Sequence, residues 1–147
     1  MTTPDTSALT SPATGVNGWA GTSYGLLTVH RFPVGDTLLE FPRGGAGAGE
    51  DAAAAAVREM VEEMGPAWAG ATLKRLGTIH PDSGLLTTEV TVYAAHLDYA
   101  PDTGHVEGIT GAAQVWVSAS GMPQLIGSGA ITDAMTLAAL ALAVCAR

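Results

Sequence analysis

The sequence has little cysteine, few basic residues and little charge of any kind. Cys145 is its single cysteine. An internal disulfide is therefore excluded, a cysteine metal site gains no support, and a reducing compartment such as the cytoplasm is expected. Six lysines and arginines stand against fourteen acidic residues, which gives a net charge of -8. Nucleic acids and anionic membranes both recognise clustered Lys and Arg, so neither is expected as a partner.

A membrane-spanning run and a signal peptide are also missing. The apolar stretch at residues 135–146 is well below the roughly 20 residues that cross a bilayer. We interpret it as a terminal helix packed on the core of a soluble protein, with Thr132 or Asp133 capping its first turn. Residues 1–15 lack a positive segment and an apolar segment, and their Thr, Ser, Pro and Ala content predicts a flexible tail.

The remaining chain has enough apolar material for one packed domain over residues 16–147. Of the 147 residues, 47% are hydrophobic and 14% are charged. Runs rich in β-branched and aromatic residues predict strands at 24–32, 37–41, 73–80, 89–97 and 114–118. Together with one strong helix over about 51–64, these strands predict an α/β layer architecture.

The predicted helix carries three acids on one face. At about 100° per residue, with Glu59 at zero, Glu62 falls at about 300° and Glu63 at about 40°. The opposite face is apolar and suits a core; it holds Ala53, Val57, Met60 and Met64. Like charges at this spacing destabilise a helix slightly, so a bound cation would explain them.

A divalent metal ion is the cation that suits these acids. Mg²⁺ takes oxygen ligands and is typically held by one or two carboxylates together with substrate phosphates. Because the chain has so few basic residues, a phosphate-bearing ligand also needs such an ion to neutralise it. The alternative is a solvated acidic helix face without any ligand.

The glycine-rich loop before the helix permits two other interpretations, and both fail. A dinucleotide-binding turn starting at Gly45 and Gly47 would place its third glycine at position 50, which is Glu50. A carboxylate there would repel the pyrophosphate from the helix N-terminus. A P-loop is excluded because no Lys-Ser or Lys-Thr pair follows the glycines.

The spacing of loop and helix instead resembles the Nudix box position by position. The matching residues are Gly44, Glu50, Arg58, Glu59, Met60, Glu62, Glu63 and Gly65. The single departure is Pro66, where the box has an aliphatic residue. Segments 40–44, 81–84 and 129–136 further resemble the ADP-ribose pyrophosphatase branch of the Nudix hydrolases. The resemblance implies a Nudix-type α/β/α sandwich with a mixed β-sheet, one catalytic helix and a C-terminal helix.

The resemblance also implies a metal site. Glu59, Glu62 and Glu63 would ligate Mg²⁺ or Mn²⁺, and the backbone carbonyl of Arg43 would add a ligand. Glu59 and Glu63 would count as catalytic through this ion. The ion would neutralise phosphoryl oxygens and activate a water molecule.

Further roles follow from the same resemblance. Gly44, Glu50, Arg58 and Gly65 would be structural members of the box, with Glu50 and Arg58 close enough on the wheel to pair. Arg31 and Arg43 are the cations expected to meet substrate phosphates. The general base would be an acid on a later loop, for which we select Glu107, with Glu59 as the alternative.

The expected activity is metal-dependent hydrolysis of a nucleoside diphosphate linked to another group, with ADP-ribose first and AMP and ribose 5-phosphate as products. Other nucleotides stay open as substrates: NADH, dinucleoside polyphosphates, nucleoside triphosphates and sugar nucleotides. The rival from another class is a non-catalytic Nudix-fold module that binds a nucleotide. The resemblance also suggests a homodimer.

Overall fold

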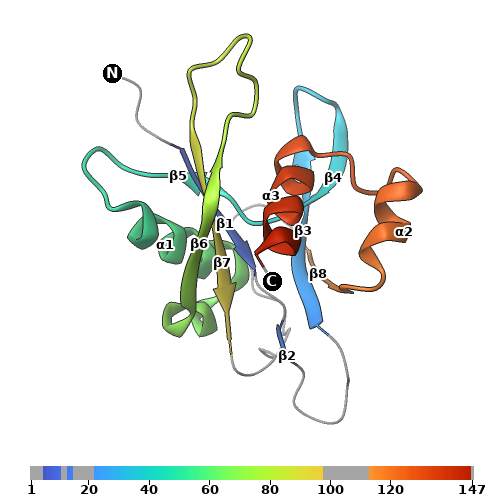
Figure 1. The fold of residues 1–147 in the computed structure, drawn as a ribbon, viewed down its shortest axis with the longest axis horizontal. Coiled ribbons are helices and arrows are strands. Elements are labelled where there is room, and N and C mark those ends of the chain that lie inside the picture. Colours follow the sequence, from blue (N-terminus) through green and yellow to red (C-terminus); the bar gives the residue numbers. More distant parts are fainter. Residues whose placement is uncertain (1–4, 11–12, 15–21, 98–112, 147) are drawn as a thin grey trace.

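The computed structural model describes residues 5–10, 13–14, 22–97 and 113–146 (Figure 1). The strands are β1 (Asp5–Thr10), β2 (Ala13–Thr14), β3 (Thr22–Arg31), β4 (Asp36–Glu40), β5 (Gly44–Gly45), β6 (Thr72–Ile79), β7 (Val90–His96) and β8 (Gln114–Ser118). The helices are α1 (Ala52–Met64), the 3₁₀ helix η1 (Pro66–Gly70), α2 (Met122–Gly127) and α3 (Ala134–Cys145). None of the described helices is long and apolar enough to cross a membrane.

The strands form two sheets. The first has the order β5-β1-β7-β6 and is mixed, because β1 runs parallel to β7 while the other pairs are antiparallel. The second sheet has the order β2-β3-β4. Strand β4 pairs with residues 27–31 of β3, and β8 pairs with residues 23–27 of the same strand. Leu27 lies opposite Glu40 in the β3–β4 ladder, so the end of β4 is placed beside the middle of β3.

Alternate residues of β3 and β7 supply two separate cores. Leu27 and Tyr93 pack with α1 and η1, whereas their neighbours Leu26 and Val92 pack with α2 and α3. Successive side chains of a strand point to opposite faces, so helices on both faces are needed to bury them. The sheets are therefore covered by α1 on one side and by α3 on the other, as Figure 1 shows.

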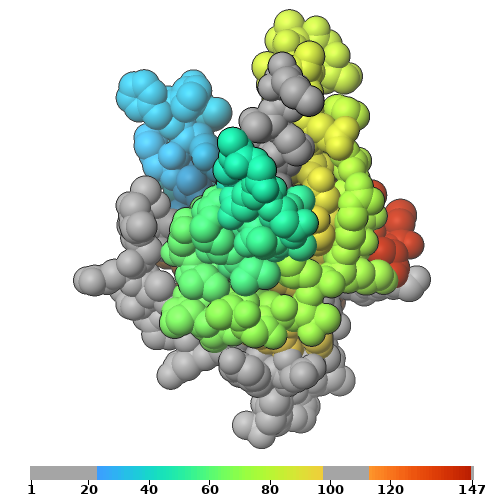
Figure 2. All heavy atoms as spheres, turned by 90° about the vertical axis from the view of Figure 1, so that its left-hand side faces the viewer, coloured from blue at the N-terminus to red at the C-terminus, as the bar shows by residue number. Residues whose placement is uncertain are grey.

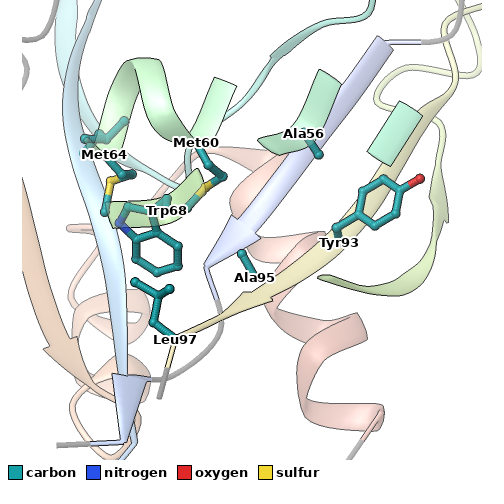
Figure 3. Close-up of a cluster of buried hydrophobic side chains, with 8 residues drawn as sticks. Ala56, Met60, Met64, Trp68, Tyr93, Ala95 and Leu97 are labelled. Atoms are coloured by element: carbon teal, nitrogen blue, oxygen red, sulfur yellow. The ribbon is translucent and has the colours of Figure 1, made fainter. Parts of the chain in front are cut away.

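The core beneath α1 fixes the orientation of the helix that carries the acids. Met60, Met64 and Trp68 are buried and point into the same space above Leu97 (Figure 3). Met60 and Met64 belong to the apolar face that the helical wheel predicted, and Ala53 packs against the same core. Val57 is not part of either core cluster, whereas Ala55 and Ala56, which lie on or beside the arc of the acids, are fully buried. With Met60 and Met64 anchored, Glu59 and Glu63 face the loop that precedes the helix, where they meet Gly44 and Arg43.

Both ends of α1 follow from local chemistry. The Asp51 carboxylate accepts hydrogen bonds from the backbone N–H groups of Ala53 and Ala54, at 3.0 Å each. Gly65 ends the helix with φ at +102°, a conformation that side chains strongly disfavour. Pro66 then begins η1, where a missing N–H costs nothing, and the buried Trp68 provides the local packing. The departure from the box at Pro66 thus coincides with the start of η1.

The strands predicted from the sequence are confirmed within one or two residues at each end, and Asp133 is the cap of α3. Several features differ from the prediction, and the two-residue strands β2 and β5 were not predicted. Within the tail expected to be flexible, residues 5–10 form β1 between β5 and β7. Its short, mixed sequence carries no local strand signal and is ordered by pairing with β7. The short helices η1 and α2 were not predicted, since each is too brief to show a periodic pattern.

Candidate active site

The three box acids of α1 differ in their surroundings. The Glu62 side chain is the most open, with 46% of its area exposed, whereas that of Glu59 is 14% exposed. In Figure 2 the loop before α1 lies between two projections, the β3–β4 turn in blue and the loop after β6 in yellow. The face that carries this loop is therefore bordered by the two hairpin tips.

Glu59 lies directly against the first glycine of the box. A Cβ atom added to Gly44 would overlap the Glu59 carboxylate group. Only glycine therefore lets the backbone of β5 approach this side chain so closely. The close approach places a partly buried carboxylate against the glycine-rich loop.

Glu63 is tied to the residue just before that glycine. The backbone N–H of Arg43 donates to Glu63 Oε2 at 3.0 Å. Burial raises the pKa of Glu63 to about 7, and repulsion from Glu59 acts in the same direction. The bond from Arg43 and the charges of Arg31 and Arg43 oppose this shift. A bound cation would favour the ionised form of Glu63 for the same electrostatic reason.

Arg58 joins the loop to the helix. Its Nε donates to Glu50 Oε1 at 3.1 Å, and its Nη2 donates to the carbonyl of Gly45 at 2.8 Å. Its Nη1 reaches Glu59 at 2.7 Å and Glu62 at 3.3 Å. The hydrogen bond from Arg58 lowers the pKa of Glu50. In turn, the hydrogen bonds to the carboxylates raise the pKa of Arg58. The predicted pairing of Glu50 with Arg58 is present in the structure.

A second ion-pair cluster lies around Glu40, which is fully buried. Arg31 donates to it through Nε at 2.9 Å and through Nη2 at 2.6 Å. Arg43 approaches the same carboxylate through Nη2 at 2.8 Å. Glu40 therefore holds two guanidinium groups, and its hydrogen bond raises the pKa of Arg31. These two arginines are the cations that the sequence assigned to substrate phosphates.

Asp133 extends this cluster to the C-terminal helix. It accepts two bonds from Arg43 Nη1, at 3.1 and 3.0 Å, and caps α3 by accepting from the backbone N–H of Thr136 at 2.8 Å. The Thr136 hydroxyl donates to Asp133 and accepts from the N–H of Phe41. The sequence showed Asp133 only as a helix cap, because its pairing with Arg43 spans 90 residues and leaves no local pattern. Glu40 received no role, because the sequence does not show that it is buried.

The acids of α1 fit a divalent ion in part. Among the residues that the structure describes, no three His, Cys, Asp or Glu side chains are grouped so as to hold a metal ion. Two carboxylates nonetheless meet the same stretch of loop, Glu59 at Gly44 and Glu63 at Arg43. One or two carboxylates suffice for Mg²⁺ when substrate phosphates complete its shell. The donor set therefore suits an ion that binds together with a phosphate ligand.

One predicted site residue, Glu107, lies outside the described residues. The others fall into two groups that meet at Arg43. The α1 group contains Gly44, Glu50, Arg58, Glu59, Glu62, Glu63 and Gly65. The second group contains Arg31 with Arg43. Arg43 belongs to both groups, because its backbone contacts Glu63 and its side chain contacts Glu40.

Comparison with known proteins agrees with this architecture. A family model for the NUDIX domain matches residues 12–133, so the chain belongs to the Nudix family. The predicted Nudix fold and the predicted class of enzyme, a Nudix pyrophosphohydrolase, are thereby confirmed. Members of the family generally use divalent metal ions and act on small nucleotide-linked substrates.

One solved structure that resembles the chain is described as an ADP compounds hydrolase. The TM-score is 0.70, with 19% identity, and the match covers 96% of this chain and 71% of the other. At this identity the likeness shows the fold. The comparison with curated proteins gives no match.

The Glu40 cluster predicts a stability effect. Glu40→Gln removes the buried charge that Arg31 and Arg43 share, so we expect the free energy of unfolding to fall by roughly 2–4 kcal/mol. Urea unfolding of both proteins measures the change. Asp36→Asn, at an exposed carboxylate of the same hairpin, is the matched control and should change stability by less than about 0.5 kcal/mol. Equal effects of the two substitutions would contradict a structural role for the cluster.

The contact between Gly44 and Glu59 predicts an effect on catalysis. Gly44→Ala must displace the Glu59 carboxylate, so we expect kcat/KM for nucleotide hydrolysis to fall by about 100-fold. Gly70→Ala is the control, because a Cβ there meets nothing within 4 Å. Steady-state kinetics with thermal unfolding of each variant separates misplacement of Glu59 from loss of fold. Full activity of Gly44→Ala would show that the close approach is irrelevant.

Proposed function

We propose that the protein hydrolyses ADP-ribose to AMP and ribose 5-phosphate in a metal-dependent reaction. The observation that carries the proposal is the convergence of Glu59 and Glu63 on residues 43–44 of the glycine-rich loop. Segments 40–44, 81–84 and 129–136, which resemble the ADP-ribose branch, support this substrate. The similar structure described as an ADP compounds hydrolase supports the same class of substrate.

The proposed ligands of the ion are Glu59, Glu62 and Glu63 with the backbone carbonyl of Arg43. Bound Mg²⁺ or Mn²⁺ would supply charge neutralisation at the phosphoryl oxygens and a more acidic water molecule. Glu59 and Glu63 are better placed for this role than the open Glu62, because their carboxylates already lie against the loop. Glu50 and Arg58 hold the loop on the helix, and the proposal gives neither of them a contact with the substrate.

Arg31 is better suited than Arg43 to bind substrate phosphate. Its side chain is 36% exposed, compared with 20% for Arg43. Its described bonds to Glu40 use Nε and Nη2, so the Nη1 group remains for a phosphoryl oxygen. Arg43 uses both of its terminal nitrogens on carboxylates. We assign Arg43 a supporting contact at most.

The proposed general base is Glu107, and Glu59 is the alternative. A base must accept the proton of the attacking water at hydrogen-bonding distance. Glu59 already serves two other purposes in the proposal, since it binds the ion and contacts Arg58. A separate acid would leave Glu59 free to remain an ion ligand throughout the reaction.

Other functions remain as alternatives to this substrate. NADH, dinucleoside polyphosphates, nucleoside triphosphates and sugar nucleotides share the phosphate bridge that the site would cleave. The rival from another class, a non-catalytic module that only binds a nucleotide, is not favoured, because the comparisons support a pyrophosphohydrolase. In calorimetry such a module gives a binding isotherm without turnover. The homodimer, the cytoplasmic location and the absence of nucleic acid as a partner stay predictions.

The proposed activity is tested first at Glu63. Purified protein with Mg²⁺ should release AMP from ADP-ribose, and Glu63→Gln should lower this rate by at least about 100-fold. Because burial disfavours the charge on Glu63, the neutral side chain should leave the fold intact. Glu89→Gln, which removes an exposed acid elsewhere, is the matched control. Full turnover by Glu63→Gln would refute the assignment of the metal site.

The identity of the base is tested by comparing two variants. Glu107→Gln should lower kcat by roughly 10²–10⁴-fold while Mn²⁺ affinity and KM stay near the wild-type values. Glu59→Gln should lose both kcat and Mn²⁺ affinity. Steady-state kinetics and Mn²⁺ titration followed by electron paramagnetic resonance provide these quantities. If Glu107→Gln keeps its kcat within twofold, the base is not Glu107.

A further inference from the structure

The charges around Glu40 balance only when Asp133 is included. Arg31 and Arg43 bring two positive charges to the single buried carboxylate of Glu40. Asp133 supplies the second negative charge through its contacts with Arg43 Nη1. With all four groups present the cluster is neutral. Glu59 and Glu62 contact Arg58, so Glu63 is the acid of α1 that has no ion pair with a described residue.

The same cluster also holds residue 43, whose backbone contacts an acid of α1. The Arg43 side chain is fixed at both terminal nitrogens, by Glu40 and by Asp133. Its backbone N–H donates to Glu63. Two residues earlier, the N–H of Phe41 donates to the Thr136 hydroxyl, which itself donates to Asp133. A continuous set of bonds therefore runs from the first turn of α3 to Glu63.

Loss of Asp133 would leave two guanidinium groups with one carboxylate in a partly buried region. Arg43 is only 20% exposed, so water would replace the lost partner poorly. Glu63 already accepts a hydrogen bond from the backbone N–H of Arg43, so the released guanidinium group of the same residue is within reach of its carboxylate. An arginine paired with Glu63 would compete with a metal ion for the same carboxylate.

We propose that Asp133 is a positioning residue for the metal site: it retains the Arg43 side chain at the N-terminus of α3 and so leaves Glu63 free to bind the ion. This role rests on the proposed function, because it assumes that Glu63 is a metal ligand. Asp133 touches neither the ion nor the substrate. It acts through Arg43 and couples the C-terminal helix to the acidic face of α1.

The test uses Asp133→Ser in the full chain. Serine keeps a good helix cap but is too short to pair with Arg43. We expect the Kd for Mn²⁺, measured without substrate by electron paramagnetic resonance, to rise at least tenfold, with the melting temperature changed by only a few degrees. Asp51→Ser is the matched control, because it makes the same change at the cap of another helix. The Asp51 carboxylate accepts hydrogen bonds from backbone N–H groups of α1. Its Mn²⁺ affinity should stay within twofold of the wild type.

A double-mutant cycle separates positioning from a general structural role. In an Arg43→Gln background the competing guanidinium group is absent, so Asp133→Ser should weaken Mn²⁺ binding by less than a further twofold. Should Asp133→Ser fail to fold, Asp133→Asn provides the same comparison with a side chain of equal size. An unchanged Mn²⁺ affinity in a folded Asp133 variant, or equal effects in both backgrounds, would overturn the inference.

The wild-type protein distinguishes the two possible failures. If it binds Mn²⁺ and Glu63→Gln abolishes that binding, the proposed metal site stands, and the Asp133 results test the positioning role alone. If the wild type does not bind Mn²⁺, or if Glu63→Gln binds it as well as the wild type, the proposed function fails first. The positioning role then falls with it.

Discussion

The contact of two helix carboxylates with the backbone of residues 43–44 is the constraint on which the rest of the structure depends. Because Gly44 has no side chain, the Glu59 carboxylate can lie where a Cβ atom would be, and the N–H of Arg43 donates to Glu63. Such an arrangement holds like charges together in partly buried surroundings, at an electrostatic cost. Capping by Asp51, the apolar face of α1 over Trp68 and the bonds from Arg58 all help to offset that cost.

The two layers of helices have different tasks in this arrangement. The core under α1 orients the acidic face, and the core under α3 supports the segment that leads into the glycine-rich loop. Thr136 and Asp133 contact that segment directly, at Phe41 and Arg43. The loop is thus held from both sides of the sheets, which gives a short glycine-rich connection a defined position although it has little packing of its own.

Much of the α1 region was predictable from the sequence because its signals are local. The spacing from Gly44 to Gly65 and the helical periodicity require only neighbouring residues, and the Glu50–Arg58 pairing follows from the same wheel. The cluster of Glu40, Arg43 and Asp133 was not predicted. Glu40 and Arg43 are only three residues apart, but the sequence does not show that Glu40 is buried, and Asp133 comes from a distant segment. Similarly, β1 is ordered by β7 and has no strand pattern of its own. Long-range electrostatics and strand pairing thus account for most of what sequence reasoning missed.

The central claim is that Glu59 and Glu63 bind a divalent ion beside the Arg43 carbonyl. Crystals grown with Mn²⁺ and a non-hydrolysable ADP-ribose analogue test it most directly, through the anomalous scattering of manganese. The account predicts an anomalous peak within coordination distance of both carboxylates, with the analogue's phosphates completing the shell. An ordered analogue without any anomalous peak near these two side chains would contradict it.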